Sequence, residues 1–473
     1  MKNFIVLLLL GAMFSGLCAQ QIPAIYTDGG SNADGYQAIL SDGSTAVTLG
    51  TTRRYPGNEN RQRMGVYLSC FDSTSGLVSG HVLFDSPDND YARDLVVVDD
   101  DTLALVSSDD YSDGTHESRI FRWAGGQVTL RADTTGTDLW AGVAHHDTLI
   151  VVGHTMSQFD EDALIGRLMP GDTIIAFDTL GWLPGQQRLF DVALLGDSLA
   201  IAVGSTDAPS ATGSGMWIVA FHPVTLDTVW TREVLAGNAA AAYGVATSDY
   251  GDIYVVGRFN SAANNYDIIA CRYDHQGLPA PNTPVSWGSL QGNDQLRAVA
   301  VDDTVVCAAG SGATSNHSDV YLVEMNLDLS IRCDTTFGSG AASESAYAVS
   351  AGSPGGTFQV AGTVLPGVVN NLIPAQADGF VAWFGCALDA IASTSPQAER
   401  LQALSVYPNP IVVGSELWVS GLSRPTSWQV VSLTGQVVGQ GQVQSGQAIA
   451  VPRASGLYLL RLEGYQPQKI MVR

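Results

Sequence analysis

The chain has 473 residues, and 22 Lys and Arg against 46 Asp and Glu give a net charge of −24 at pH 7. Nucleic acids and anionic membrane surfaces attract clustered Lys and Arg, so this balance excludes both as partners. Only 14% of the residues are charged and 51 are glycine, which is typical of a turn-rich all-β protein rather than a helical one.

The first 19 residues have the pattern of a secretory signal peptide. Lys2 precedes an apolar run that ends at Met13, and small residues up to Ala19 provide a cleavage point. A lipoprotein signal is disfavoured because Leu17, which is not small, precedes Cys18. The apolar run is shorter than the ~20 residues of a membrane span. We therefore expect an exported, soluble mature chain with no transmembrane segment.

A unit of about fifty residues recurs seven times between residues 20 and 387. Each unit has an apolar strand, a polar turn, a second apolar strand, a variable loop and a third apolar strand, and a less regular fourth segment closes most units. The apolar anchors of the first strands are Ile39, Leu95, Val143, Val192, Val245, Val299 and Val349. One such unit cannot bury both of its faces alone, so the repeat predicts a seven-bladed β-propeller over 20–387.

The ends of this repeat predict how the ring closes. The seventh unit has no evident fourth strand after Phe384, whereas the segment 22–28 is a spare strand ahead of the first unit. We expect 22–28 to pair beside 378–385 and complete the last blade, because this removes an exposed strand edge.

Two units resemble a known family of repeats. The text DVYLVEMNLDLSIRCDTTFGSG at 319–340 is similar to the delta-60 repeat of bacterial secreted propellers, which ends in Asp-x-x-Phe-Gly, and 255–279 resembles the same repeat. The resemblance implies a propeller and carries no defined activity.

The last part of the chain has a different organisation. Residues 388–403 are small and polar without periodicity, which predicts a linker. Short alternating strands at ~10-residue spacing follow over 404–473 and favour a small Ig-like β-sandwich.

This C-terminal segment resembles the type A sorting domain of the type IX secretion system of Bacteroidota. The residues that carry the resemblance are Tyr407, Pro408, Asn409, Pro410, Gly435, Gly456, Tyr458 and Lys469. The resemblance implies that 404–473 is recognised by the type IX machinery after export to the periplasm. The protein would then be released or held at the outer-membrane surface. An ordinary Ig-like binding module is the alternative.

Five cysteines remain after removal of the signal peptide, an odd number that does not form a disulfide framework. Cys271 and Cys307 lie within apolar runs, which favours buried free thiols. Cys333 and Cys386 lie at strand ends and could pair with each other in an oxidising compartment.

Candidates for chemistry are few. Asp109, Asp110 and Asp113 form an oxygen-rich loop that could hold calcium, and a solvated loop is the alternative. His145 and His146 are adjacent, and neighbouring side chains on an extended chain point to opposite faces, so we expect no metal site there. The sequence contains none of the catalytic, phosphate-binding or dinucleotide-binding motifs that can be recognised by spacing. We predict no catalytic residue and, calcium aside, no cofactor.

These observations favour a non-catalytic binding or adhesion protein that is secreted or displayed at the cell surface. Its longest loops, at 51–64, 108–117, 205–215, 258–265, 311–318 and 363–377, all join second and third strands and should gather at one end of the ring. There they would hold a polysaccharide or a protein. The alternative is a polysaccharide lyase or hydrolase with its site in the propeller funnel. Convergent ionisable groups beside a deep pocket would favour the enzyme, and a broad polar or aromatic rim would favour binding.

Overall fold

The computed structural model describes residues 25–26, 35–41, 45–52, 64–72, 76–86, 88–99, 101–109, 116–124, 127–155, 161–181, 185–207, 214–235, 238–262, 265–288, 292–302, 304–313, 317–338, 343–351, 358–364, 378–384, 405–407, 416–420, 425–432, 437–444, 447–450, 456–462 and 468–472. These residues form strands and turns and contain no helix. The chain divides into two compact units, Met1–Ala387 and Leu388–Arg473.

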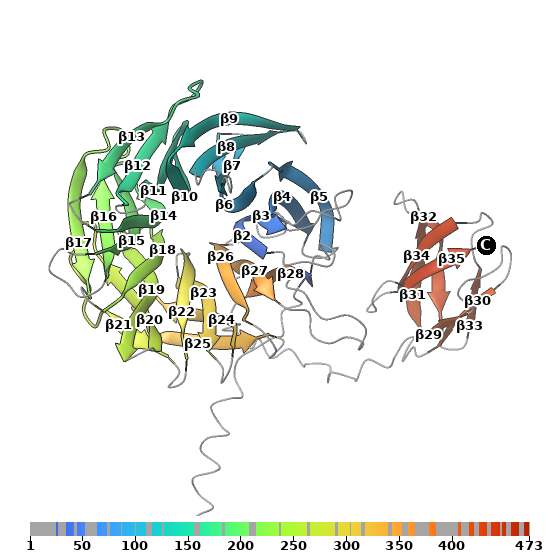
Figure 1. The fold of residues 1–473 in the computed structure, drawn as a ribbon. Coiled ribbons are helices and arrows are strands. Elements are labelled where there is room, and N and C mark those ends of the chain that lie inside the picture. The colour runs from blue at the N-terminus through green and yellow to red at the C-terminus, as the bar shows by residue number, and fades with distance from the viewer. Residues whose placement is uncertain are drawn as a thin grey trace, which may run out of the picture. The chain divides into compact units, whose positions relative to one another are not determined.

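Four-stranded antiparallel sheets make up the described part of the first unit, and seven are seen there (Figure 1). The first three are β2 (Gly35–Ser41), β3 (Thr45–Thr52), β4 (Gly65–Asp72) and β5 (Gly76–Phe84); β6 (Asn89–Val98), β7 (Asp101–Asp109), β8 (His116–Ala124) and β9 (Gln127–Thr135); and β10 (Thr137–His145), β11 (Thr148–Thr155), β12 (Ala163–Leu168) and β13 (Ala176–Leu180). In each sheet the strands pair in chain order, which is how successive hairpins pair.

Three further sheets repeat this order, and a seventh differs in its last strand. They are β14 (Gln187–Leu195), β15 (Leu199–Thr206), β16 (Gly215–Phe221) and β17 (Thr228–Val234); β18 (Ala241–Thr247), β19 (Ile253–Ala262), β20 (Asn265–Tyr273) and β21 (Val285–Trp287); β22 (Gln295–Val301), β23 (Val305–Ala313), β24 (Ser318–Asn326) and β25 (Ile331–Phe337); and β26 (Ser345–Ala351), β27 (Phe358–Val364) and β28 (Asp378–Phe384) with β1 (Ile25–Tyr26).

The first strands of the seven sheets form a closed circle. Each contacts the first strand of the next sheet, from β2 through β6, β10, β14, β18 and β22 to β26, which contacts β2 again. Figure 1 shows these seven strands nearest the centre, with the other strands of each sheet farther out. Radial four-stranded sheets in a closed order are the arrangement of a β-propeller.

The seventh sheet is completed from the other end of the chain. Ile25 pairs with Val381 and Tyr26 pairs with Phe380, so β1 lies antiparallel to β28. This is the pairing expected for 22–28, and it joins the two ends of the first unit within one sheet.

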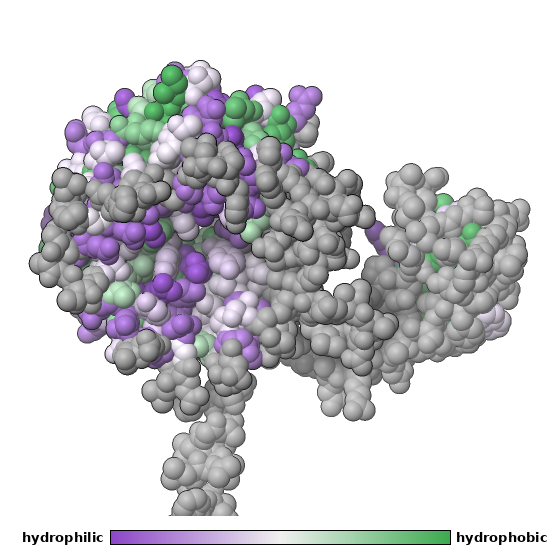
Figure 2. Space-filling model, in the orientation of Figure 1, coloured by the Kyte–Doolittle hydropathy of each residue, from purple (hydrophilic) through white to green (hydrophobic). Residues whose placement is uncertain are grey.

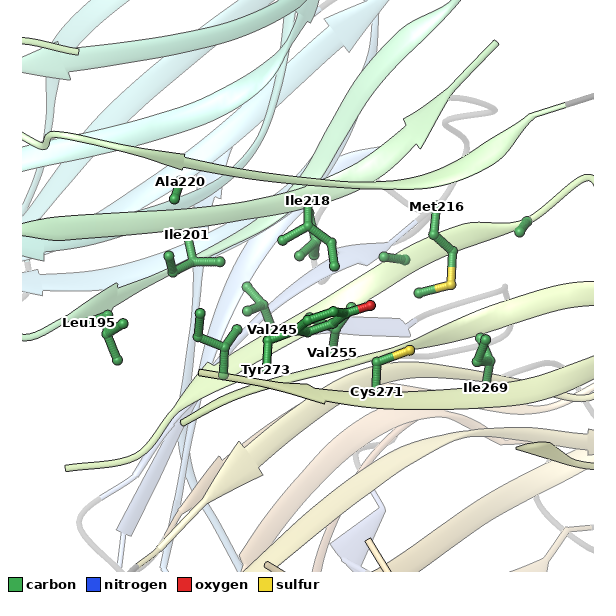
Figure 3. Packing of buried hydrophobic residues seen from close by; sticks show 14 residues of the cluster. Leu195, Ile201, Met216, Ile218, Ala220, Val245, Val255, Ile269, Cys271 and Tyr273 are labelled. Carbon is green, nitrogen blue, oxygen red and sulfur yellow. The ribbon is translucent and has the colours of Figure 1, made fainter. Parts of the chain in front are cut away.

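Apolar side chains fill the space between neighbouring sheets. Figure 3 shows one such layer, in which Ile201 and Ile218 of the fourth sheet face Val255 and Cys271 of the fifth. All seven residues of β16 are buried, because the strand is covered on both faces. Burial on both sides explains the continuous apolar runs in the sequence.

The described cysteines fall into two classes. Cys271 and Cys307 are free and fully buried, as expected, and burial raises the pKa of the Cys271 thiol to about 12, so it is an inert core residue. Cys70 is also free. Cys333 is disulfide-bonded. Because Cys386 lies outside the described residues, its pairing with Cys333 stays a prediction.

The second unit contains two antiparallel sheets. One is β29 (Ser405–Tyr407), β30 (Glu416–Ser420) and β33 (Gln447–Ala450), and the other is β32 (Val437–Val443), β31 (Thr426–Ser432), β34 (Gly456–Leu462) and β35 (Gln468–Val472). Leu417 and Val419 of the first sheet share one core with Val430, Leu460 and other buried side chains of the second. In neither unit does the described part of the chain include a helix able to cross a membrane.

Candidate functional site

A β-bulge interrupts the first strand of each of the seven sheets. The register shifts by one residue in the pairing with the second strand, for example between Tyr36 and Ala38 in β2, and one residue is left without a cross-strand partner. We call these seven residues the belt: Gln37, Arg93, Trp140, Phe190, Tyr243, Arg297 and Tyr347. All of them are half-buried, and all line one cavity at the centre of the ring.

The bulges also show which residues of the units are equivalent. Two residues after the belt residue stand Val192 in β14 and Val245 in β18, and both are buried. In β10 this place is taken by Gly142, whereas Val143 is only partly buried. The prediction of Val143 as the anchor of the third unit is therefore wrong. The equivalent residue is Gly142, which an alignment of apolar residues skips.

In six sheets a glycine of the second strand makes room for the bulge. Gly310 of β23 lies opposite Leu296, and a Cβ atom on it would overlap the carbonyl oxygen of Gln295. The equivalent glycines of other sheets are Gly50, Gly153, Gly204, Gly257 and Gly362. The second sheet differs, with Val106 opposite Ala92. The close approach of two backbones explains the glycines that end most second strands.

The belt lies at the end of the ring from which the long loops leave. Asp138, two residues before Trp140, pairs with His154 near the end of β11, and the bulge of every first strand is likewise opposite the end of the second strand. The connections between second and third strands start at those ends, although many of their residues lie outside the described part of the chain. The long loop expected at 258–265 is wrong, because β19 runs to Ala262 and β20 begins at Asn265. The connections and the belt therefore lie at the same end of the ring.

Five neighbouring members of the belt contact one another in order around the ring. The ring centroids of Trp140 and Phe190 are 5.0 Å apart, and those of Phe190 and Tyr243 are 5.4 Å apart. The Cζ atom of Arg297 lies 5.3 Å from the Tyr243 ring centroid and 5.2 Å from that of Tyr347. Aromatic faces and guanidinium groups thus form a continuous arc.

The other arginine of the belt is held by an acid. Arg93 Nη2 lies 2.8 Å from Asp138 Oδ2, and its Nε donates to Ser107 Oγ at 2.7 Å. Its Cζ atom lies 4.2 Å from the Trp140 ring centroid, and Trp140 Nε1 donates to the same Asp138 oxygen at 3.0 Å. Arg93 is therefore neutralised, and together with Asp138 it fixes the orientation of the Trp140 ring.

The belt surrounds a cavity of about 260 Å³. The part of the surface near the middle of the ring that Figure 2 shows is mostly hydrophilic. This volume lies just below the range of typical ligand pockets, which is ~300–1,000 Å³. It fits a single ring or one substituent of a ligand, and larger molecules would rest on the rim.

Two carboxyl groups, those of Asp94 and Asp191, also line the cavity. Asp94 accepts hydrogen bonds from the N–H groups of Leu95 at 2.8 Å and Gly142 at 2.9 Å. Asp191 does the same with Val192 and Val245, both at 2.8 Å. One bond of each pair reaches the first strand of the next sheet, so each carboxyl group ties two neighbouring sheets together.

Burial raises the pKa of both carboxyl groups to about 7, against the opposing effect of their backbone hydrogen bonds, and the charge of Asp94 adds to the shift of Asp191. Below pH ~4 the folded and unfolded chains both hold these protons, and between pH ~4 and 7 only the folded chain does. Stability therefore falls as the pH rises through this range. The fall is less than ~1.4 kcal/mol per pH unit for each group, because both residues are only half-buried and solvent screens part of the effect.

Asp191→Asn is expected to remove the part of the pH dependence of stability that comes from Asp191. The free energy of unfolding is measured by urea titration at pH 5 and at pH 8. The difference between variant and wild-type protein should shift in favour of the variant by at least ~1 kcal/mol from pH 5 to pH 8. An unchanged difference between the two proteins at both pH values would contradict the role of the Asp191 charge.

A buried histidine, His154, also lies near the belt. His154 is 3% exposed, and its Nε2 lies 4.0 Å from Glu161 Oε2, while Glu161 is paired with Arg188. Burial, as the largest cause, lowers the pKa of His154 to about 4, so the imidazole is neutral at pH 7. Among the residues described, no three His, Cys, Asp or Glu side chains are grouped to hold a metal ion.

The predicted metal residues have mixed outcomes. Asp109 is the last residue of β7, and its Oδ1 lies 2.7 Å from His116 Nδ1. Asp110 and Asp113 lie outside the described residues, so the calcium site stays a prediction. His145 and His146 do not point to opposite faces, since their ring centroids are 4.4 Å apart. That expectation is wrong because His146 has φ 55° and is not extended.

The residues of the sorting resemblance fall on both sheets of the second unit. Tyr407 ends β29 and pairs with Trp418, whereas Gly456, Tyr458 and Lys469 all belong to the β34–β35 pair. Pro408, Asn409, Pro410 and Gly435 lie outside the described residues.

Neither a protein-family model nor a curated protein matches the sequence. Among solved structures, the chain is similar to PorZ, a surface component of the type IX secretion system of Porphyromonas gingivalis, at 12% identity over 92% of this chain and 69% of PorZ, with a TM-score of 0.34. The β-propeller domain of the Trilobed protease of Pyrococcus furiosus is 8% identical over 78% of this chain and 97% of the domain, with a TM-score of 0.43. Sqt1 of Chaetomium thermophilum is 13% identical over 77% of this chain and 98% of Sqt1, with a TM-score of 0.42.

The apolar pattern of the units does not by itself reveal the belt. A signal for it was present, because each first strand has a large side chain followed by Ala, Asp or Gly and then by an aliphatic residue or, in the third unit, Gly142. Examples are Tyr243 in AYGVA and Arg297 in LRAVA. Without the bulge, these large residues read as ordinary members of an alternating strand.

Proposed function

We propose that this chain is a secreted, seven-bladed β-propeller that binds a polysaccharide at the belt and is delivered to the cell surface by the type IX secretion system. The seven sheets and the closed circle of first strands support the number of blades. For 404–473, two antiparallel sheets around one core support an Ig-like sorting domain, together with the motifs in the sequence.

The observation that carries the binding function is the continuous arc from Trp140 to Tyr347. Flat aromatic faces provide large contact area at low entropic cost, and sugar rings stack on such faces. The arc is half-buried around the cavity, at the end of the ring where the second strands connect to the third strands. A broad aromatic and polar rim is the arrangement expected of a binding protein rather than of an enzyme.

The enzyme alternative has one observation in its favour. Asp94 and Asp191 line the same cavity, and a pKa of about 7 suits a general acid. Both oxygen atoms of each carboxyl group, however, already accept backbone hydrogen bonds. This pattern favours a structural role. Turnover of a bound polysaccharide that is lost in Asp94→Asn would establish the enzyme instead.

Glycan-array screening of the mature chain tests binding, and Tyr243→Ala tests its location. We expect the variant to bind its best glycan at least ~10-fold more weakly, because it removes an aromatic face from the middle of the arc. Tyr250→Ala is the matched control: Tyr250 is 70% exposed and lies in the β18–β19 turn, at the opposite end of the ring. Equal affinity of both variants and of the wild-type protein would place the ligand elsewhere.

Export has a separate test in the producing cell. Removal of 404–473 should leave the propeller in the periplasm, because the segment that resembles the sorting domain is then missing. Fractionation with an antibody against the propeller measures this, and Tyr243→Ala serves as a full-length control that should still reach the surface. Surface display of the shortened chain would contradict type IX delivery.

A further inference from the structure

Arg297 differs from the other arginines described in the first unit. Most of them pair with an acid, as Arg93 does with Asp138 and Arg272 with Asp252, or donate to backbone carbonyl oxygens, as Arg232 does to Gly277. Within the described residues, Arg297 has neither an acidic partner within 4.0 Å nor a hydrogen bond, and its Nε is buried without an acceptor. Its recorded contacts are with the Tyr243 and Tyr347 rings.

A second arginine extends this arrangement away from the centre. The Cζ atom of Arg258 lies 5.5 Å from the Tyr243 ring centroid and 4.3 Å from that of Tyr266. Arg258 donates to the amide oxygen of Gln295 at 3.2 Å, and its Nε also lacks an acceptor. Tyrosine and arginine therefore alternate from Tyr266 to Tyr347, and no carboxylate among the described residues neutralises the two guanidinium groups.

Two uncompensated cations are unexpected in a chain with a net charge of −24. Both arginines are half-buried, and the Nε of each is buried without an acceptor. A buried charged donor without an acceptor is costly, and the cost is recovered when an anion supplies the acceptor. A guanidinium has parallel N–H groups that match the two oxygens of a carboxylate, or those of a sulfate ester. Tyr243 and Tyr347 flank the Arg297 guanidinium group beside the cavity.

We propose that the belt selects an acidic sugar, one that carries a carboxylate or sulfate group, and that Arg297 is the group that binds this anion. The inference rests on the proposed polysaccharide-binding function and gives it a substrate class. Arg93 does not compete for the anion, because Asp138 already neutralises it. The cavity of about 260 Å³ admits one charged ring, and the overall negative charge of the chain disfavours densely charged polymers.

The test uses the mature full chain on an array of matched oligosaccharide pairs that differ only in having a neutral sugar or its carboxylated or sulfated form. We expect the acidic member of the best pair to bind at least ~10-fold more tightly. Arg297→Gln should reduce the affinity for the acidic member by about 10- to 100-fold more than it reduces the affinity for the neutral member. Arg297→Lys should retain part of the preference, since it keeps the charge but loses the bidentate geometry.

Arg122→Gln is the matched control, because Arg122 is exposed and pairs with Asp101 away from the belt. It should bind as the wild-type protein does, and thermal melting of all variants checks that they are folded. Equal binding of neutral and acidic members, with Arg297→Gln unaffected, would overturn this inference and leave polysaccharide binding intact. Binding of no glycan would overturn the proposed function and this inference with it.

Discussion

Gly310→Ala is expected to destabilise the propeller by about 3 kcal/mol, at the upper end of the range for overpacked positions. A Cβ atom there would overlap the Gln295 carbonyl oxygen and lie 2.8 Å from Leu296 Cα. Both obstacles are backbone atoms of the bulged first strand, which cannot rotate away as a side chain can. The free energy of unfolding from urea titration, monitored by tryptophan fluorescence, measures the loss.

Gly312→Ala is the control in the same strand. The nearest atom to a Cβ on Gly312 is Tyr321 Cβ at 3.4 Å, an ordinary contact, so this variant should be neutral or gain a few tenths of a kcal/mol through the unfolded state. Similar losses in both variants would mean that glycine matters in β23 for flexibility and not for the close approach of the bulge.

A mature chain that begins at Gly29, without β1, is expected to lose on the order of 2 kcal/mol of unfolding free energy, since β1 pairs through two residues and each backbone hydrogen bond contributes about 1 kcal/mol. The seventh sheet would then end at β28, which would expose unpaired backbone groups along its edge. We therefore also expect the shortened chain to associate, as an increase in apparent mass on size-exclusion chromatography.

Substitution of both described residues of β1 by threonine separates backbone pairing from side-chain packing. Ile25→Thr with Tyr26→Thr keeps the N–H and C=O groups that face Val381 and Phe380, and threonine favours strands. This variant should remain a monomer. A shortened chain that is as stable and as monomeric as the full one would show that β1 does not close the ring.

Much of the fold could be predicted because it depends on burial, and burial leaves a pattern. Strands such as β16 are covered on both faces and appear as apolar runs, and the missing fourth strand of the last unit indicated which segment completes it. The free thiols of Cys271 and Cys307 could be predicted in the same way, since both lie within such runs.

The candidate site could not be predicted in this way, because it depends on a register shift. A bulge adds one residue to a strand and turns that residue toward the centre, and no single unit shows this in its sequence. The orientation of His146 could not be predicted either. Neighbouring side chains point to opposite faces only on an extended chain, and His146 has a positive φ at a turn.

The bulges have a consequence for how such a ring diversifies. A residue that no partner strand faces can be exchanged without disturbing the pairing on either side of it. Gln37, Arg93 and Trp140 occupy equivalent places in three neighbouring sheets and have little chemistry in common. Each sheet thus contributes one residue to the lining of the central cavity, and each of these residues can change separately while the fold keeps its shape.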